Sequence, residues 1–347
     1  MFIFEADPEP SRSTVPYHRS MSERNDAPEP GYPSGAELLI TPEALSARLA
    51  AEAGEATEAA AAEAADDLAG GEQGARRAPA PRTRVLDVRW SLANPAGHAD
   101  YLAGHIPGAV YVDLESELSD VGPATAGRHP LPGGAALTDS ARRWGLNPGD
   151  TVVAYDGGGN FAAARLWWVL RDAGFANVAL LDGALAGWIA AGLPLEQSAP
   201  APTPGTVRLR PGHSPTLSLE AAGRFAQEHA LLDARAPERF AGESEPIDPV
   251  AGHIPGARNL PTSGNVDAHG RFLSPRELRD RFAGVGVSLD GEPAASPRVG
   301  IYCGSGITAS HALFALALAG GEGALFPGSW SQWSNHPELP VETGHTP

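Results

Sequence analysis

Cysteine is almost absent from this sequence, because Cys303 is the only one among 347 residues. A single thiol cannot form an internal disulfide, and it cannot build a cysteine-rich zinc site. Basic residues are also scarce: 25 lysines and arginines stand against 42 aspartates and glutamates, which gives a formal net charge of -17. An acidic chain of this kind is a poor non-specific binder of nucleic acid. We therefore expect no nucleic-acid partner.

A secretory leader and long hydrophobic runs are missing as well. The first residues, MFIFEADPEPSRS, have no basic region and reach acid and proline after four positions, which is not the pattern of a signal peptide. No apolar run approaches the roughly 20 residues that a membrane-spanning helix needs. These absences predict a cytoplasmic protein with no membrane partner.

Two stretches lack the patterning of a folded domain. Residues 1–34 are rich in proline, serine and charge and show no period, so we expect a disordered tail. Residues 54–82 begin as an alanine and glutamate run, which is compatible with a helix, and end in glycine and proline. This segment interrupts a predicted helix, TPEALSARLAA, with Thr41 as its N-cap, that leads into a predicted strand, RVLDVRW. We interpret 54–82 as a surface insertion that the fold tolerates.

The rest of the chain repeats itself. The string AGHIPGA occurs at 103–109 and again at 251–257, and TVVAYDGGGNFAAARLWW aligns with RVGIYCGSGITASHALF. Landmarks that keep their order and spacing over this distance indicate a duplicated domain and not a short solenoid repeat. We place the N-terminal domain at 35–198, an interdomain linker at 199–214 and the C-terminal domain at 215–347.

Each copy alternates short β-branched runs with segments of helical periodicity. TVVAY and ALLDA are typical of strands, whereas FAAARLWWVLRDAG and TASHALFALALAGG carry apolar residues at helical spacing and end in glycine. In SPRELRDRFAGVG, Ser274 and Glu277 have the spacing of a capping box. This alternation predicts an α/β fold with two domains, each a mainly parallel sheet flanked by helices.

Cys303 is placed where a parallel sheet usually carries its site. It follows the predicted strand RVGIY and precedes a predicted helix that starts near Thr308, and ligands bind at the carboxyl ends of such strands. Gly304 and Gly306 allow the backbone to fold tightly, with amide N–H groups pointing at the sulfur. The helix N-terminus adds positive potential, and both effects favour the nucleophilic thiolate. The loop is therefore predicted to hold an anion or a persulfide on Cys303, with Thr308 capping the helix or bonding the sulfur.

Two chemistries use a cysteine in such a loop. A cysteine phosphatase needs an arginine at the end of the loop to bind phosphate in a bidentate way, and Ala309 and Ser310 stand there instead. Sulfur transfer needs only a thiolate and an anion-binding loop, so the residues favour it. A persulfide carrier or redox sensor that does not turn over is a hypothesis of another class.

Together these motifs resemble the tandem rhodanese family, of the thiosulfate and 3-mercaptopyruvate sulfurtransferase type. The resemblance covers residues 36–53 and 83–343 and is carried by the AGHIPGA strings, GRHPLP, YDGGGNFAAARLWW and CGSGITA. It implies a catalytic C-terminal domain and an inactive N-terminal one, in which Asp156 takes the position of Cys303. The resemblance also implies that the reaction uses no metal or organic cofactor and that the sulfur donor is a small anion. The implied acceptor is cyanide or a thiol, and the thiol is either a small molecule or part of a thioredoxin-like protein.

The loop Cys303-Gly304-Ser305-Gly306-Ile307-Thr308 resembles the 3-mercaptopyruvate type, because the thiosulfate type places basic residues after the cysteine. The resemblance implies that 3-mercaptopyruvate is the main donor, with thiosulfate as the alternative. It also implies that the loop residues bind the donor: Gly304, Gly306, Ile307 and Thr308.

Further roles follow from the same resemblance. Ser305 is expected in a relay with His129, from GRHPLP, and with Glu115 or alternatively Asp113. Arg239 matches the arginine that binds the anionic donor. The second donor-binding arginine is expected about nine residues later, where this chain has Ile247-Asp248.

Several conspicuous residues are expected to be structural. His105 and His253, in the AGHIPGA strings, are expected to fix loops through backbone hydrogen bonds. Arg235 is expected to support the site without binding the donor, and nothing in the sequence brings Arg258 to it. Five tryptophans are expected in the core and between the domains, with Trp330 also a candidate for the mouth of the site: Trp167, Trp168, Trp188, Trp330 and Trp333.

Overall fold

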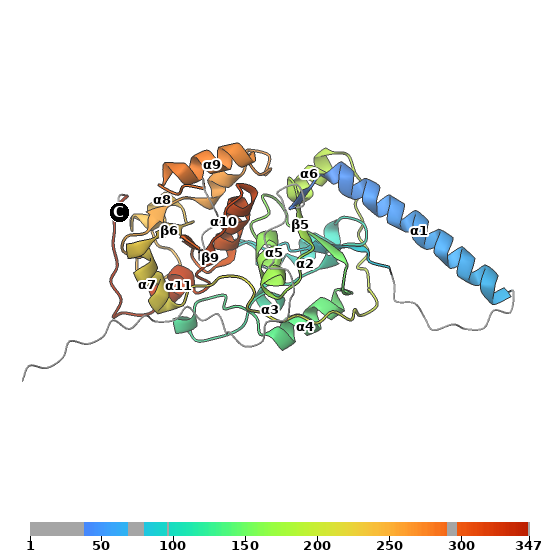
Figure 1. The fold of residues 1–347 in the computed structure, drawn as a ribbon, viewed down its shortest axis with the longest axis horizontal. Coiled ribbons are helices and arrows are strands. Elements are labelled where there is room, and N and C mark those ends of the chain that lie inside the picture. Colours follow the sequence, from blue (N-terminus) through green and yellow to red (C-terminus); the bar gives the residue numbers. More distant parts are fainter. Residues whose placement is uncertain (1–37, 69–79, 96, 290–296, 346–347) are drawn as a thin grey trace, which may run out of the picture. The chain divides into compact units, whose positions relative to one another are not determined.

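The computed structural model describes residues 38–68, 80–95, 97–289 and 297–345, so the predicted tail 1–34 lies outside the described residues (Figure 1). The N-terminal half contains, in chain order, β1 (Leu39–Ile40), α1 (Pro42–Leu68), β2 (Thr83–Asp87), α2 (His98–Ala103), β3 (Val110–Tyr111), α3 (Leu114–Glu117), η2 (Ala124–Ala126), α4 (Gly134–Arg143), β4 (Thr151–Tyr155), α5 (Ala163–Asp172), β5 (Val178–Leu181) and α6 (Ala184–Ala190). The C-terminal half contains α7 (Leu219–Glu228), β6 (Ala230–Asp233), α8 (Pro237–Phe240), β7 (Arg258–Asn259), η3 (Thr262–Asn265), α9 (Pro275–Gly284), β8 (Val299–Tyr302), α10 (Ile307–Leu318), β9 (Ala324–Leu325) and α11 (Ser329–Trp333).

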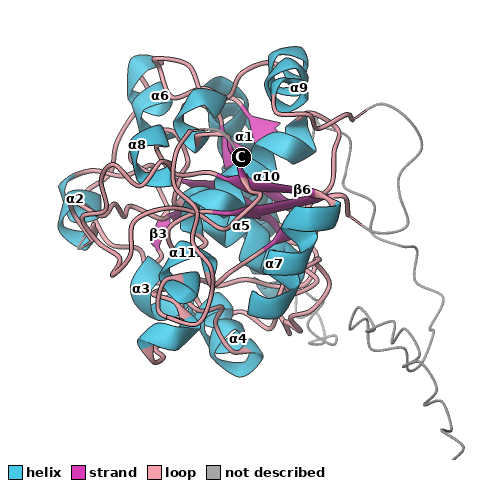
Figure 2. Ribbon diagram, turned by 90° about the vertical axis from the view of Figure 1, so that its left-hand side faces the viewer, coloured by secondary structure: helices cyan, strands magenta, loops and turns pink. Residues whose placement is uncertain are grey.

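Each half builds one parallel sheet. The N-terminal sheet has the strand order β1-β5-β4-β2-β3 and the C-terminal sheet the order β7-β6-β8-β9, and every pairing between these strands is parallel. Figure 2 shows the strands enclosed by helices. Four strands of the N-terminal sheet, in the order β5-β4-β2-β3, correspond to β9-β8-β6-β7 of the C-terminal sheet, and β1 is an additional strand at the edge beside β5. The predicted α/β fold with two parallel sheets is confirmed.

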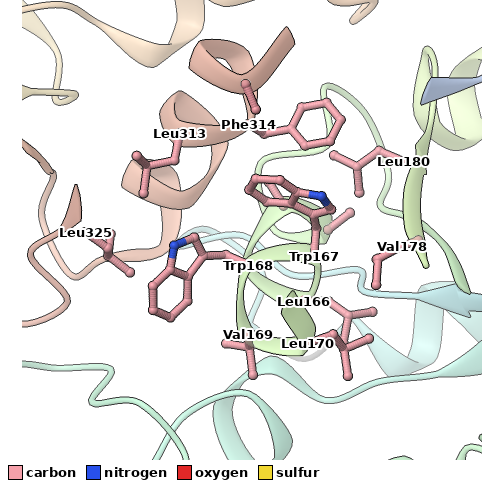
Figure 3. Packing of buried hydrophobic residues seen from close by; sticks show 14 of the residues in the cluster. Leu166, Trp167, Trp168, Val169, Leu170, Val178, Leu180, Leu313, Phe314 and Leu325 are labelled. Carbon is pink, nitrogen blue, oxygen red and sulfur yellow. The ribbon is translucent and has the colours of Figure 1, made fainter. Parts of the chain in front are cut away.

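The two halves share a hydrophobic core, in which α5 packs against α10. Trp167 and Phe314 meet edge to face there, with 4.9 Å between ring centroids (Figure 3). Burying a large apolar side chain contributes about 1.5–3 kcal/mol, so this contact holds the halves together. The prediction that the tryptophans pack in the interior is confirmed, because all five are buried: Trp167, Trp168, Trp188, Trp330 and Trp333.

Helix ends follow local rules. The N–H of Ala44 donates to the Thr41 hydroxyl at 3.2 Å, and Ser274 and Glu277 form the predicted capping box at the start of α9. α5 and α10 are followed by Gly174 and Gly320, whose φ angles of 83° and 85° are positive, as expected for glycine after a helix. These predictions are confirmed. The sequence was sufficient for them because each depends on residues only three or four positions apart.

The segment 54–82 begins as a continuation of α1, which runs to Leu68. Residues 53–59 are largely exposed. Glu52, just before this segment, accepts hydrogen bonds from the backbone and the hydroxyl of Thr83, at 2.9 and 2.6 Å, which ties the helix to the start of β2. That 54–82 is an insertion without a role in the core stays a prediction.

The predicted domain boundaries also stay predictions. Val207 and Leu209, within the predicted linker 199–214, are buried in the shared core, so this stretch packs against the domains that it joins. Among the helices in the described ranges, none has both the length and the apolar character that a bilayer span requires.

Candidate active site

Cys303 directly follows β8, at the carboxyl end of the C-terminal sheet. It is 2% exposed, and the N–H of Gly306 donates to its sulfur at 3.1 Å. Its own N–H donates to the Ser329 hydroxyl at 3.1 Å, and its carbonyl accepts from the N–H of Trp330 at 2.9 Å. The first two residues of α11 therefore hold the loop from outside, while the loop presents a backbone donor to the sulfur.

Gly306 controls the shape of this loop. Its φ angle is 82°, in the left-handed region, and a Cβ atom here would lie 2.4 Å from the carbonyl oxygen of Pro327, so only glycine fits. Gly306 is the N-cap of α10, the helix begins at Ile307, and no side chain caps it. The prediction that Thr308 caps the helix is wrong, because Thr308 already lies inside the first turn.

The N-terminal half contains a second loop of the same kind. Asp156 follows β4 as Cys303 follows β8, and its carboxylate accepts backbone hydrogen bonds from Gly158 at 2.9 Å, Asn160 at 3.0 Å and Ala162 at 2.9 Å. Burial raises the pKa of Asp156 to about 6, and these hydrogen bonds oppose that rise. Here the backbone amides already surround a negative group, and no thiol is present.

Ser305, His129 and Glu115 form a continuous chain of contacts. Nδ1 of His129 lies 2.8 Å from the Ser305 hydroxyl, and Nε2 lies 3.2 Å from a carboxylate oxygen of Glu115. A carboxylate only accepts hydrogen bonds, so the hydrogen of neutral His129 belongs on Nε2, and Nδ1 is left to accept the Ser305 O–H. Burial lowers the pKa of His129, although Glu115 acts in the opposite direction.

The acidic member of this chain is Glu115 and not the alternative, Asp113. The carboxylate of Asp113 accepts the N–H of Ser116 at 3.0 Å and caps α3. Glu115 is oriented by Trp90, whose indole N–H donates to it at 2.7 Å. The structure therefore brings together the three residues that the sequence predicts, from two halves of the chain; their catalytic role stays a proposal.

Arg239, the predicted donor-binding residue, is paired with carboxylates. Its guanidinium contacts Glu245 at 2.6 Å and Asp248 at 3.2 Å. Asp248 also pairs with Arg128, from the N-terminal half. A Cβ atom on Gly304 would lie 3.2 Å from Nη2 of Arg128 and 3.4 Å from Nη1 of Arg239. Two guanidinium groups thus border the cysteine loop, and an anionic donor would compete with Glu245 and Asp248 for them.

Arg128 was missed in the sequence analysis. The sequence places an aspartate, Asp248, nine residues after Arg239, where a second arginine is expected. The structure brings a cation to the same region from the other half of the chain. One feature of the sequence could have pointed to Arg128: it directly precedes His129, a predicted site residue, in GRHPLP.

A cavity of about 390 Å³ lies between the loop after β2, the Asp156 loop and the start of α10. Its lining includes Arg89, Trp90, Phe161, Ile307 and Thr308. Trp90 links it to the relay, because its ring meets that of His129 edge to face at 5.5 Å. Ile307 and Thr308, predicted to bind the donor, therefore face an open space next to the relay.

The remaining candidates are structural. Arg235 makes a bidentate pair with Asp233, with Nε donating to Oδ1 and Nη2 to Oδ2. It also donates to the carbonyl of Gly252 at 2.7 Å, and its guanidinium lies over the ring of Trp330 at 4.7 Å. Trp330 is fully buried, so its placement at the mouth of the site is wrong. The predicted backbone role of the two AGHIPGA histidines is confirmed: Nδ1 of His105 and of His253 each lies 2.8 Å from a carbonyl oxygen.

Comparisons with known proteins agree with this architecture. The family model of the rhodanese-like domain matches residues 72–191 and 219–336. A Mycobacterium tuberculosis protein named "Putative thiosulfate sulfurtransferase SseB" is 48% identical over 265 residues, which are 75% of this chain and 90% of that protein. A Pseudomonas aeruginosa protein named "Probable 3-mercaptopyruvate sulfurtransferase" is 46% identical over 281 residues, 79% of this chain and 96% of that protein.

A solved structure shows the same fold. The crystal structure of SseA from Escherichia coli, a 3-mercaptopyruvate sulfotransferase, superposes with a TM-score of 0.62 at 32% identity, over 72% of this chain and 92% of that one. The model matches fall on both halves of the chain, and each half has its own parallel sheet. The chain therefore belongs to the rhodanese family, with two rhodanese-like domains in tandem.

Proposed function

We propose that this chain transfers sulfur from 3-mercaptopyruvate to a thiol or cyanide acceptor through a persulfide on Cys303. Sulfur transfer as the reaction class follows from the family and from the relatives. The choice of donor, the persulfide on Cys303 and the roles of single residues rest on the site. A cytoplasmic location and the identity of the acceptor, a small thiol, a thioredoxin-like protein or cyanide, stay predictions.

In the proposed reaction, the Cys303 thiolate attacks the sulfur of the donor. The carbon–sulfur bond of 3-mercaptopyruvate breaks, and its electron pair passes to the carbon as the enolate of pyruvate. The enolate gains one proton to become pyruvate, and the new persulfide gives up the proton that the donor thiol brought. The Gly306 N–H, 3.1 Å from the sulfur, is positioned to stabilise the negative charge throughout.

The observation that carries this choice is the contact between Ser305 and His129. Only 3-mercaptopyruvate brings a thiol proton that must be moved, because thiosulfate loses sulfite without any proton transfer. A hydroxyl held 2.8 Å from a neutral, buried histidine, which in turn contacts a carboxylate, is suited to moving that proton. An enzyme that uses thiosulfate would have no proton for such a relay to move.

The alternative donor is thiosulfate, and one observation favours it. Arg128 and Arg239 both border Gly304, and a compact dianion gains more from two guanidinium groups than a monocarboxylate does. Their pairing with Glu245 and Asp248 offsets this advantage. We therefore rank 3-mercaptopyruvate first.

A direct comparison of the two donors tests the proposal. With cyanide as the common acceptor, we expect kcat/KM for 3-mercaptopyruvate to exceed that for thiosulfate by at least roughly tenfold, which is about 1.4 kcal/mol. Steady release of pyruvate and of sulfite gives the two rates. The reverse ratio would assign thiosulfate as the donor, and release of a single equivalent followed by no turnover would indicate a persulfide carrier.

Replacing Arg239 by alanine should weaken the use of both donors. A hydrogen bond to a charged group contributes about 1.5–3 kcal/mol, so kcat/KM should fall roughly 10- to 150-fold with each donor. Arg258→Ala is the matched control, because Arg258 is half-buried in the same half of the chain and donates to the carbonyl of Val285 at 2.7 Å. Equal losses in both variants would mean that Arg239 acts only through stability.

A further inference from the structure

Arg165 is a buried cation on α5, in the half of the chain that lacks the cysteine. Its side chain is fully buried. Nη2 donates to the carbonyls of His129 at 2.9 Å and Pro130 at 3.3 Å, and Nε donates to that of Leu118 at 3.3 Å. All of these acceptors are neutral. Among the described residues, several other arginines form ion pairs with carboxylates, but no carboxylate forms an ion pair with Arg165.

The third nitrogen of this guanidinium faces the cysteine loop. Nη1 is buried and has no hydrogen-bond partner among the described residues. A Cβ atom on Gly306, the residue whose N–H donates to the Cys303 sulfur, would lie 3.3 Å from Nη1. Burial lowers the pKa of Arg165 to about 10, and its interaction with Cys303 opposes this effect. The guanidinium therefore remains charged at neutral pH.

An uncompensated cation in this position is costly. The penalty for removing an ion from water is several kcal/mol in a protein interior, and a nearby opposite charge offsets it. The carbonyl acceptors compensate only part of the charge of Arg165, and the two N–H groups on Nη1 have no acceptor among the described residues. A negative charge on the sulfur of Cys303 would supply both the missing acceptor and the missing counter-charge.

We propose that Arg165 is the counter-ion of the Cys303 sulfur, and that it favours the thiolate before sulfur transfer and the anionic persulfide after it. The proposal rests on the proposed function, in which Cys303 carries the sulfur. It assigns to the N-terminal half an electrostatic role in the reaction, in addition to the relay residues. Arg165 is a positioning residue, because it makes no bond in the reaction and acts through the charge state of Cys303.

The test measures the charge on Cys303 without any donor. Cys303 is the only cysteine, so all thiol alkylation by iodoacetamide, followed on the peptide that contains Cys303, comes from it, and the thiolate is the form that reacts. In Arg165→Met, the pH of half-maximal alkylation should rise by about one unit or more, which slows alkylation at pH 7 roughly tenfold. Arg165→Lys, which keeps the charge, should recover part of this loss.

Two controls separate charge from structure. Arg142→Met removes another arginine of the N-terminal half, which is half-buried and donates to the carbonyl of Val207 at 3.0 Å, and it should leave the alkylation profile unchanged. His129→Ala removes the relay without removing a charge, so it measures any effect that passes through His129. A shift in Arg165→Met no larger than that in His129→Ala would overturn the proposal.

A second variant keeps the test open if Arg165→Met does not fold. Arg165→Gln removes the charge but keeps hydrogen-bonding groups, and an unchanged pH of half-maximal alkylation in this variant would overturn the proposal. Because no donor is present, these results are independent of which donor the enzyme uses. Failure of the proposed function would instead appear as a lack of turnover in a protein with a normal alkylation response.

Discussion

Cys303→Ser is expected to abolish sulfur transfer from either donor while leaving the fold intact. A serine hydroxyl is close in size to the thiol and can accept the N–H of Gly306, which now donates to the sulfur at 3.1 Å. Unlike the thiol, it is not ionised at neutral pH and cannot hold a persulfide. The contacts of residue 303 with Ser329 and Trp330 use its backbone, so they survive the change. The far-ultraviolet circular dichroism spectrum and the melting temperature should therefore stay close to those of the wild type.

Mass spectrometry makes this prediction specific. The wild type treated with donor should gain one sulfur atom, and the serine variant should gain none. Because the chain has no other cysteine, no second thiol can take up the sulfur and hide the loss. Turnover by the variant, or added sulfur on it, would refute Cys303 as the carrier.

Ser305→Ala is expected to lower turnover of 3-mercaptopyruvate by something on the order of 10²-fold and to spare thiosulfate. This magnitude is that of a general acid–base step, and only one of the two donors brings a proton to move. His129→Ala should give the same donor-specific loss, because His129 accepts the Ser305 O–H in the geometry described above. Ser310→Ala is the matched control: Ser310 is also buried near the loop, and its hydroxyl donates to the carbonyl of Gly306 at 3.0 Å.

The pH dependence gives an independent view of the same relay. Burial lowers the pKa of His129 below its usual 6.5, and only the neutral ring can accept a proton from Ser305. Turnover of 3-mercaptopyruvate should therefore persist below pH 6.5 and fall as the pH drops through the lowered pKa. The His129→Ala variant should lack this acidic limb.

Other outcomes would point to other roles for Ser305. If Ser305→Ala slows both donors equally, and as much as Ser310→Ala does, the hydroxyl only shapes the loop. If it slows thiosulfate alone, the donor preference is the reverse of the one proposed, and the two arginines beside Gly304 are the better guide to the substrate.

Features that depend on neighbours in the sequence were within reach of the sequence alone. The strands β2, β4, β6 and β8, the helices α5, α9 and α10, the capping box at Ser274 and the glycine-rich loop around Cys303 each follow from residues a few positions apart. The duplication also predicted two parallel sheets, because equivalent motifs occupy equivalent places in both copies. One local detail failed: α10 starts at Ile307 because Gly306 adopts the left-handed conformation, which the letters around Thr308 do not reveal.

Only the tertiary structure decided which charges meet. Ser305 and His129 are 176 positions apart, and Arg128 and Asp248 are 120 apart. Resemblance predicted the first pair, but no pattern in the sequence predicted that Arg239 is held by Glu245 and Asp248, or that Arg165 faces the cysteine loop without a carboxylate. The physical reason is that the energy of a charge depends on its distance from other charges and on its exposure to water, and both are set by packing between halves of the chain that are far apart in sequence.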